Sequence, residues 1–301
     1  MKSLADQLDD YQRGIQQGEH FHAISCMTEL LTEYRQGLSD SHWEALIVPE
    51  CRQHPISELL KQDPYTRRAF EKPRGYPGDA EMLDYAYYPT TPSDASEVGR
   101  RVFEVVTTSP NALSVRWRRE HIAKLMVELA EKRPSFDVLS VACGHCRELE
   151  LLDDTTRSKI NRFVALDHDE QTLQRAGIVN QGLKLTTWQC NVKKLPEHDG
   201  QSGFDFIYSI GIYDYLQRYQ AEKLTEWLWA KLNPGGELLI ANFTPDNWGR
   251  GYMEAFMDWN LTLRSREQMR RLIPSSSVHV NSCLYFDPYR NVSFMRAQKP
   301  K

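Results

Sequence analysis

Two cysteines, Cys143 and Cys146, lie in the segment VLSVACGHCRELE at residues 138–150, separated by Gly144 and His145. A Cys-x-x-Cys pair at a strand-to-helix junction can serve as a redox dithiol, because the helix N-terminus lowers the pKa of one thiol. The pair can also supply two zinc ligands, although a structural zinc takes four. In a third interpretation the functional residue is Gly144, because a glycine lets a ligand approach the backbone where a Cβ would block it.

Acidic and amide side chains follow the next two apolar segments. The segment FVALD ends in Asp167, about 20 positions after Gly144, where a carboxylate is placed to bind the two hydroxyls of a ribose. His168 could stack on an adenine, and Asn191 with the N–H of Val192 could bind the adenine edge. These residues favour a nucleoside-binding loop over a redox pair, since a thioredoxin-like protein has no use for the acid.

The same residues stand at the ends of short apolar runs that alternate with helical patterns. Such alternation predicts βαβ units and a parallel sheet covered on both faces. Ligands of an open parallel sheet gather at the carboxyl ends of its strands. We expect strands at residues 138–143, 163–167, 183–190, 204–211 and 236–243, helices at 147–154, 169–180 and 222–232, and a terminal hairpin formed by 277–287 and 292–298.

The chain before residue 111 has a different pattern. Apolar residues recur every three or four positions in the first 70 residues, which predicts helices. Residues 71–94 are rich in Pro, Gly and Tyr and predict a structured loop, in which Gly78 and Asp79 are placed to start a short helix. An amphipathic helix is expected at 114–131. We therefore expect a helical N-terminal region at 1–110 and a second domain at 111–301.

The amino-acid composition limits the classes of molecule that the protein is expected to bind. Asp and Glu number 41 against 37 Lys and Arg, and no run of like charges forms a tail, so nothing indicates a nucleic-acid or membrane surface. The polar N-terminus does not fit a signal peptide, and no stretch approaches the roughly 18 apolar residues of a membrane span. Six cysteines lack the spacing of a secreted disulfide framework. We expect a cytoplasmic protein that acts on a small molecule, without a metal, and with a homodimer as one candidate state.

Taken together, VACGHCRE, FVALD, QCNV, SIGIYDYL and LNPGG resemble the class I S-adenosylmethionine-dependent methyltransferases over residues 115–297. The resemblance implies S-adenosylmethionine as the cofactor and an α/β fold whose seven-stranded Rossmann-like sheet has an antiparallel seventh strand. VACGHCRE keeps one glycine where the family's first loop carries several. VACGHCRE, GIYDYL, GYMEAFMDW and KPRGYPGDA further resemble a bacterial subgroup related to 3-hydroxypalmitic acid methyl ester biosynthesis.

The resemblance assigns the cofactor contacts to the strand ends. Gly144 is expected to lie against the methionine portion, while Arg118, on the helix before the first strand, can pair with its carboxylate through two hydrogen bonds. A solvated face is the alternative for the arginines of that helix. Ser209 and Gly211 are expected to contact the ammonium. The full set of expected cofactor contacts is Ala142, Gly144, His145, Asp167, His168, Asn191, Val192, Ser209, Gly211, Arg118 and Tyr76.

Substrate and catalytic residues are also implied by the resemblance. Tyr76 and Asp79 are expected to form a lid that folds over the cofactor and substrate and excludes water, and packing between domains is the alternative. The expected substrate-binding residues are Asp79, Tyr252, Glu254, Asp258, Trp259 and Arg264. The expected catalytic residues at the end of the fourth strand are Tyr213, Asp214 and Tyr215, where a tyrosine can donate a hydrogen bond to a substrate oxygen and an acid can accept a proton.

The sequence thus predicts a methyltransferase that acts on a small molecule, with an oxygen acceptor, a carboxylate or a hydroxyl, favoured by the subgroup resemblance. An amine or heterocycle as nitrogen acceptor fits the aromatic and acidic residues equally well. Two alternatives of another kind are a thiol-disulfide oxidoreductase that uses the CGHC pair and a noncatalytic sensor of S-adenosylmethionine. A nicotinamide-dependent enzyme fits less well, because VACGHCRE lacks the G-x-G-x-x-G spacing of a pyrophosphate loop.

Overall fold

The computed structural model describes residues 2–197, 200–274 and 281–301. Within them the chain forms two compact units. The first consists of residues up to Arg116 together with Asn247–Asn260, and the second consists of Trp117–Asp246 and Leu261–Lys301. Helix α9 (Pro110–Lys132) begins in the first unit and continues into the second. The segment 247–260 therefore joins the helical unit although it follows most of the sheet in sequence.

Helices build the first unit, as the apolar periodicity predicts. Their ends follow capping rules: Ser3 and Asp6 form a capping box at the start of α1, and Gly18 ends this helix in the left-handed conformation. The expected short helix after Gly78 is confirmed, because the Asp79 side chain accepts a hydrogen bond from Met82 N and caps α7. The elements are α1 (Leu4–Gln17), α2 (His20–Gly37), α3 (Asp40–His42), the π-helix η1 (Trp43–Ile47), α4 (Val48–Gln53), α5 (Ile56–Leu60), α6 (Pro64–Glu71), α7 (Ala80–Tyr87), α8 (Glu97–Thr108) and α13 (Arg250–Phe256).

Helix α13, in the segment 247–260, packs closely on α2. A Cβ built on Gly251 would lie 2.5 Å from the carbonyl oxygen of Leu31, so only glycine permits this approach. The hydroxyl of Tyr252 lies 3.0 Å from Thr66 Oγ1, in a buried position. The packing partners of α13 lie some 200 positions earlier in the chain and could not be read from local periodicity.

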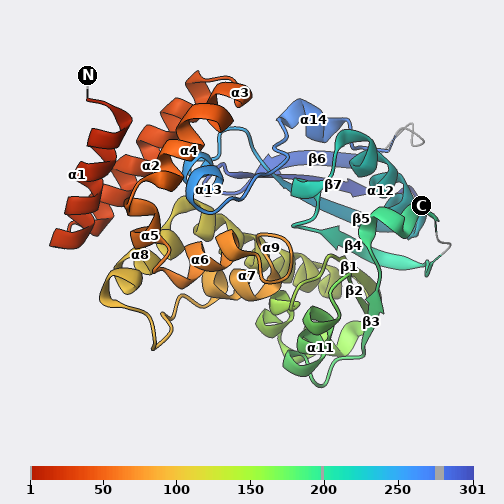
Figure 1. Ribbon diagram of the computed structural model, residues 1–301. Helices are drawn as coiled ribbons and strands as arrows, with labels where there is room; N and C mark the ends of the chain where they lie inside the picture. Colours follow the sequence, from red (N-terminus) through yellow and green to blue (C-terminus); the bar gives the residue numbers. More distant parts are fainter. Residues whose placement is uncertain (1, 198–199, 275–280) are drawn as a thin grey trace. The chain divides into compact units, whose positions relative to one another are not determined.

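The second unit is built on a seven-stranded sheet with the order β3-β2-β1-β4-β5-β7-β6 (Figure 1). Strands β1 to β5 are parallel, and β7 is antiparallel to both β5 and β6. The predicted seven-stranded α/β sheet with an antiparallel seventh strand is confirmed. The strands are β1 (Phe136–Val141), β2 (Ile160–Asp167), β3 (Leu185–Gln189), β4 (Phe204–Ser209), β5 (Leu232–Phe243), β6 (Asn281–Phe286) and β7 (Val292–Gln298).

Two sequence-based boundaries differ from the structure. The helix expected at 147–154 is a 3-10 helix, η2 (Arg147–Leu151), and α10 (Asp154–Lys159) starts only after Asp153, whose side chain caps it by accepting from Thr156 N. The fifth strand, expected at 236–243, begins earlier, at Leu232, and its register with β4 shifts near this start. Residues 277–280 of the expected hairpin lie outside the described part of the chain.

Helices and 3-10 helices cover the sheet. Helix α11 (Glu170–Val179) packs against β2 and β3, α12 (Arg218–Ala230) packs against β5, and α14 (Arg266–Arg270) packs against β6 and β7. The 3-10 helices η3 (Val192–Glu197) and η4 (Tyr213–Tyr215) follow β3 and β4. Every residue of β4 is buried, which fits the continuous apolar run expected of a central parallel strand.

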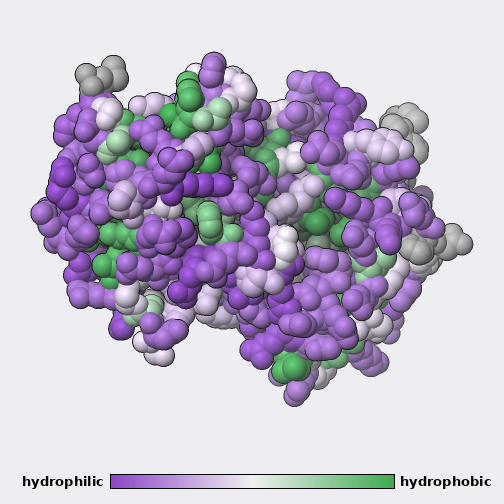
Figure 2. All heavy atoms as spheres, viewed as in Figure 1, coloured by the Kyte–Doolittle hydropathy of each residue, from purple (hydrophilic) through white to green (hydrophobic). Residues whose placement is uncertain are grey.

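The surface seen in Figure 2 is mostly hydrophilic, and its hydrophobic residues form small separate groups. Among the described residues, no helix combines the length and the apolar character that crossing a bilayer requires.

Candidate functional site

The loop after β1 holds the CGHC residues in a tight turn. Cys146 N donates to Cys143 O at 3.2 Å, and Cys143 N donates to Leu166 O in β2 at 3.0 Å. Ala142, Gly144 and Cys146 all have positive φ angles of 52–56°. Only Gly144 adopts this conformation without steric cost, so the single glycine of VACGHCRE stands where the turn needs one.

Asp167 connects the ends of three neighbouring strands. Its buried carboxylate accepts hydrogen bonds from Gly144 N at 3.2 Å and from Asp169 N at 3.1 Å. Its backbone carbonyl accepts from Cys190 N, just after β3, at 2.9 Å. One residue thus links the turn after β1, the end of β2 and the end of β3, which is the edge where a parallel sheet binds its ligands.

The candidate adenine-binding residues differ in exposure. His168 Nδ1 lies 3.1 Å from Asp167 Oδ1, and this hydrogen bond raises the pKa of His168. Asn191 is exposed and uses Oδ1 to accept from Lys193 N at 3.0 Å, whereas Val192 is buried in the core of the unit. His168 and Asn191 therefore stay close to the Asp167 edge, and Val192 can contribute only its backbone.

The ends of β1 and β4 lie side by side. Ser209 Oγ donates to Val141 O at 3.1 Å in a buried position. Apart from its two chain neighbours, none of the described residues has an atom within 4 Å of the position that a Cβ of Gly211 would occupy, so open space remains beside this residue. His145 is buried and Ala142 is half-buried. The structure thus brings most of the predicted cofactor residues of the second unit to one edge.

Arg118 on α9 is buried, with 3 % of its side chain surface exposed. Its Nε has no hydrogen-bond partner among the described residues. The positive charge of the Arg118 guanidinium favours the ionised form of the Asp214 carboxyl and so lowers its pKa. The two groups therefore lie in the same region. A buried guanidinium with an unpaired donor is energetically costly, so this arrangement suits an anionic group of a ligand.

Asp214 in η4 is buried, and burial raises the pKa of its carboxyl to about 7. The hydrogen bond from Phe243 N at 2.7 Å lowers the pKa of Asp214, and so do the charges of Arg118 and Arg264, but burial has the larger effect. The backbone carbonyl of Asp214 accepts from Thr262 N at 2.7 Å. An acid in this range can exchange a proton near neutral pH.

Tyr213 and Arg264 have structural partners. The Tyr213 hydroxyl lies 2.9 Å from Thr225 Oγ1 of α12, within the core, so it points away from the strand edge. Arg264 donates to the carbonyls of Tyr213 and Leu216, both at 2.5 Å. Arg264 therefore fixes the η4 turn that carries Asp214. Tyr215 is half-buried at the end of the same turn.

The predicted substrate residues of the first unit are held in ion pairs and packing there. Glu254 is buried and pairs with Arg35 and Arg250, each at 2.6 Å. Asp258 pairs with Arg52 at 2.7 Å and with Lys72. Asp79 is buried and pairs with Arg68 at 2.8 Å, Trp259 and Tyr252 are buried, and Tyr76 is half-buried.

Two functional candidates were missed by the sequence reasoning. Glu148, in η2, is buried, its pKa is raised by burial, and it accepts a hydrogen bond from the Tyr208 hydroxyl. Asn242, at the end of β5, is buried and donates to Phe243 O and Thr262 O at 2.9 Å. Their neighbours in sequence include other polar and charged residues, so the sequence does not single them out and only their burial in the structure does.

The CGHC thiols are not arranged as a redox dithiol of the thioredoxin kind. Both cysteines are free, and the pKa of each thiol is raised, that of Cys143 chiefly by burial and that of Cys146 by its hydrogen bond to Cys143 and by burial. The turn leads into a 3-10 helix rather than the α-helix N-terminus that would stabilise a thiolate. The structure therefore gives no support to the oxidoreductase alternative.

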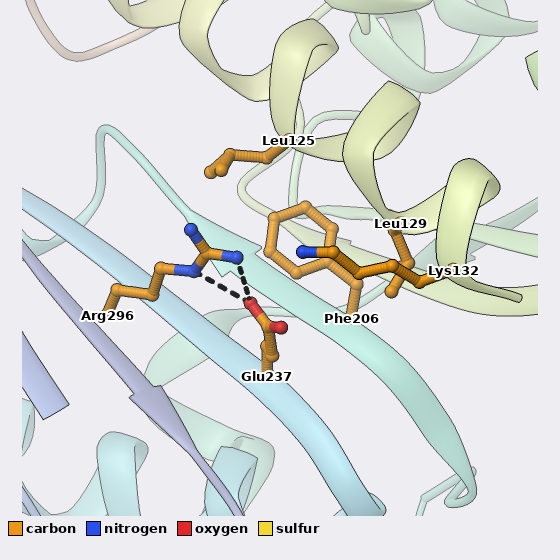
Figure 3. A pocket seen from close by; sticks show the side chains of 6 residues that line it. All are labelled: Leu125, Leu129, Lys132, Phe206, Glu237 and Arg296. Carbon is orange, nitrogen blue, oxygen red and sulfur yellow. Dashed lines mark hydrogen bonds and ion pairs between the residues drawn. The ribbon is translucent and has the colours of Figure 1, made fainter. Parts of the chain in front are cut away.

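A separate hollow lies between α9 and the sheet (Figure 3). Glu237 and Arg296 form an ion pair across it at 2.6 Å, and Phe206 is the register partner of Glu237. These residues precede the carboxyl ends of β4 and β5, so the hollow lies away from the edge that carries Asp167. Its lining residues are Leu125, Leu129, Lys132, Phe206, Glu237 and Arg296.

We expect Asp214→Asn to change how stability depends on pH. Because the folded-state pKa of Asp214 is about 7 and the ordinary value is 3.8, the folded protein binds more protons than the unfolded chain between these values. The free energy of unfolding of the wild type should therefore fall through this window as pH rises, whereas Asn cannot titrate. Urea denaturation should show the variant gaining about 2 kcal/mol relative to wild type between pH 5 and pH 8.

The control for this experiment is Asp153→Asn, since the pKa of Asp153 is lowered and the carboxyl is ionised throughout the range. Its stability curve should run parallel to that of the wild type. A parallel curve for Asp214→Asn as well would show that Asp214 ionises normally in the folded protein.

One family of known proteins is similar to the part of the chain that contains this edge. Residues 138–236 match the family model described as "Methyltransferase domain". They span β1 to the start of β5 and include Gly144, Asp167, Asn191 and Asp214. A search of curated proteins finds no match to the chain.

Several solved structures are similar to this chain. One is a possible exported protein from Bordetella parapertussis, with 21 % identity, a TM-score of 0.64, and coverage of 89 % of this chain and 99 % of that chain. At this identity the likeness supports the fold alone. The N-methyltransferase NodS from Bradyrhizobium japonicum has 14 % identity and a TM-score of 0.43, covering 61 % and 97 % of the two chains. The magnesium protoporphyrin IX methyltransferase from Synechocystis has 11 % identity and a TM-score of 0.47, covering 63 % and 86 %.

Proposed function

We propose that the protein is an S-adenosylmethionine-dependent methyltransferase, which holds its cofactor along the ends of β1, β2, β3 and β4 and methylates an oxygen atom of a small molecule. The observation that carries the proposal is the buried Asp167 carboxylate, which joins the turn after β1 to the ends of β2 and β3. Oδ2 accepts from Gly144 N and retains a lone pair for one ribose hydroxyl, while Oδ1 accepts from Asp169 N and lies 3.1 Å from His168 Nδ1, a partner that the second hydroxyl would displace.

The other cofactor roles follow from position along this edge. Ala142, Gly144 and His145 lie in the turn beside the methionine portion, and Ser209 and Gly211 lie beside the ammonium. His168, Asn191 and the backbone of Val192 contact the adenine. Arg118 binds the cofactor carboxylate, which would supply the partner that its buried Nε lacks. The bound cofactor supplies an electrophilic methyl group on a sulfonium.

Asp214 is the residue that we propose for proton transfer. With a pKa of about 7 it is partly ionised at neutral pH and can accept the proton of a hydroxyl acceptor on a carboxylate oxygen. A carboxylate acceptor would have no proton to lose and would leave Asp214 without this role. Methylation of a hydroxyl should therefore rise with pH through about 7, while methylation of a carboxylate should not.

Tyr213 and Arg264 act as supports in this proposal. The Tyr213 hydroxyl is bonded inside the core, and Arg264 holds the carbonyls on both sides of η4. Tyr252, Glu254, Asp258, Trp259 and Asp79 are engaged within the helical unit, and their roles in substrate binding stay predictions. Tyr76 as part of a lid, Tyr215 as a donor to the acceptor, membership in the bacterial subgroup, the homodimer and the cytoplasmic location stay predictions.

The proposal is tested by incubating the full chain with S-adenosylmethionine carrying a deuterated methyl group and a bacterial metabolite extract. Mass spectrometry should find a product that carries the label on oxygen, and heat-inactivated protein serves as the control. A label on nitrogen would favour the amine or heterocycle alternative. Tight binding of S-adenosylhomocysteine with no labelled product would favour the sensor, and absence of binding would refute the cofactor site itself.

A further inference from the structure

Two free thiols lie within one turn of the proposed cofactor loop. Cys146 N donates to Cys143 O at 3.2 Å, which closes a four-residue turn and brings the two Cα atoms close together. Each thiol affects the pKa of the other, as expected for neighbouring sulfur atoms. A disulfide requires Cα atoms within about 7 Å, and a closed turn meets this condition.

The two thiols differ in access. Cys143 is half-buried, whereas Cys146 is 1 % exposed. Cys143 is therefore the more accessible residue of the pair, and Cys146 is shielded from solvent. This order is that of an attacking thiol followed by a resolving thiol.

The pair is coupled to the residues that we assign to the cofactor. Cys143 Sγ donates to Gly144 O at 3.3 Å, and Gly144 N donates to the Asp167 carboxylate at 3.2 Å. Covalent bonding would bring the sulfur atoms to about 2 Å from each other and remove the thiol proton that Cys143 donates. The loss of this donor and the new S–S bond both act on the turn that presents Gly144 N to Asp167.

We propose that Cys143 and Cys146 form a reversible redox switch whose disulfide weakens cofactor binding; this inference rests on the proposed function. A low-molecular-weight disulfide is the oxidant. The Cys143 thiolate attacks it and releases one thiolate leaving group, forming a mixed disulfide. The Cys146 thiolate then displaces the second small thiol, so two protein thiols lose two electrons and two protons, and one small disulfide becomes two thiols.

The rate of this oxidation depends on pH. Because the pKa values of both thiols are raised, the thiolate is scarce at neutral pH, and its fraction grows about tenfold for each pH unit. The switch therefore responds to a sustained oxidising environment rather than to a brief one. Oxidation by glutathione disulfide should be clearly faster at pH 9 than at pH 7.

The test uses the full chain, with glutathione disulfide as oxidant and S-adenosylhomocysteine as the calorimetric ligand. The oxidised protein should have a mass lower by two hydrogen atoms and should bind the ligand at least about tenfold more weakly, and dithiothreitol should restore both properties. In Cys146→Ser, oxidation should stop at a glutathione adduct on Cys143, detected by peptide mass spectrometry.

Two variants provide the controls. Cys143→Ser retains a hydroxyl donor for Gly144 O, and its affinity should not respond to the oxidant. Cys190→Ser removes a nearby thiol outside the turn and should respond as the wild type does. Failure to form the internal disulfide, or a disulfide that changes the dissociation constant less than twofold, would overturn the switch. Failure of the reduced wild type to bind the ligand would instead overturn the proposed cofactor site.

Discussion

Asp167→Ala is expected to weaken binding of S-adenosylhomocysteine by about 1.5–3 kcal/mol, which corresponds to roughly 10- to 150-fold in the dissociation constant. The variant removes two acceptor oxygens from a ribose that we place at the edge of the sheet. It also frees Gly144 N and Asp169 N, so the loop loses its own anchor. Isothermal titration calorimetry measures the affinity, and thermal unfolding measures how much stability the variant loses.

The matched control is Asp169→Ala, two positions along the chain. Asp169 caps α11 by accepting from Gln171 N at 3.0 Å, so its removal should cost about 1 kcal/mol of stability. Ligand affinity should stay close to that of the wild type. If both variants reduce affinity equally, a general loss of stability explains the effect, and Asp167 has no special part in binding the ribose.

Arg118→Met is expected to weaken S-adenosylhomocysteine binding by at least about tenfold, because a buried charge-assisted hydrogen bond is worth about 1.5–3 kcal/mol. Methionine keeps much of the apolar volume of the side chain. Decarboxylated S-adenosylmethionine lacks the carboxylate that we assign to Arg118, so calorimetry should give it nearly the same affinity for variant and wild type. Comparing the two ligands thus isolates the contact between Arg118 and the cofactor carboxylate.

Arg119→Met is the matched control for that experiment. Arg119 is the next residue of α9, is also buried, and acts on Glu148 rather than on Asp214. Its replacement should lower stability without distinguishing the two ligands. If Arg118→Met weakens the binding of both ligands equally, Arg118 serves as the counter-charge of Asp214 and does not bind the cofactor carboxylate.

The order of elements in the second unit could be predicted because each signal is local. Short apolar runs alternate with helical patterns, and each strand end carries its own marker, such as Gly144 after β1 or Asp167 at the end of β2. A parallel βαβ chain brings consecutive strand ends to one edge of the sheet, so residues far apart in sequence meet by topology. This is why the sequence alone predicts that Asp167 lies beside the Gly144 loop.

The packing of residues 247–260 could not be predicted in the same way. Their aromatic and acidic pattern suits a pocket wall as well as a helix that packs in a core. Only the tertiary structure places Glu254 on Arg35, 219 positions earlier, and the Tyr252 hydroxyl on Thr66. Contacts of such separation depend on how whole helices assemble, and periodicity within one helix does not encode the partner.

Within η4, the order of the residues follows from the sequence, whereas the direction of their side chains follows from the tertiary structure. The sequence by itself determined that Tyr213, Asp214 and Tyr215 follow the fourth strand and that Asp167 ends the second, because chain order and hydrophobic pattern fix those positions. Only the tertiary structure decided that the Tyr213 hydroxyl points at Thr225, that Arg264 holds the turn, and that Asp214 is buried with a pKa of about 7. Burial and hydrogen-bond direction come from neighbours supplied by other elements, and these set the charge and reach of each group.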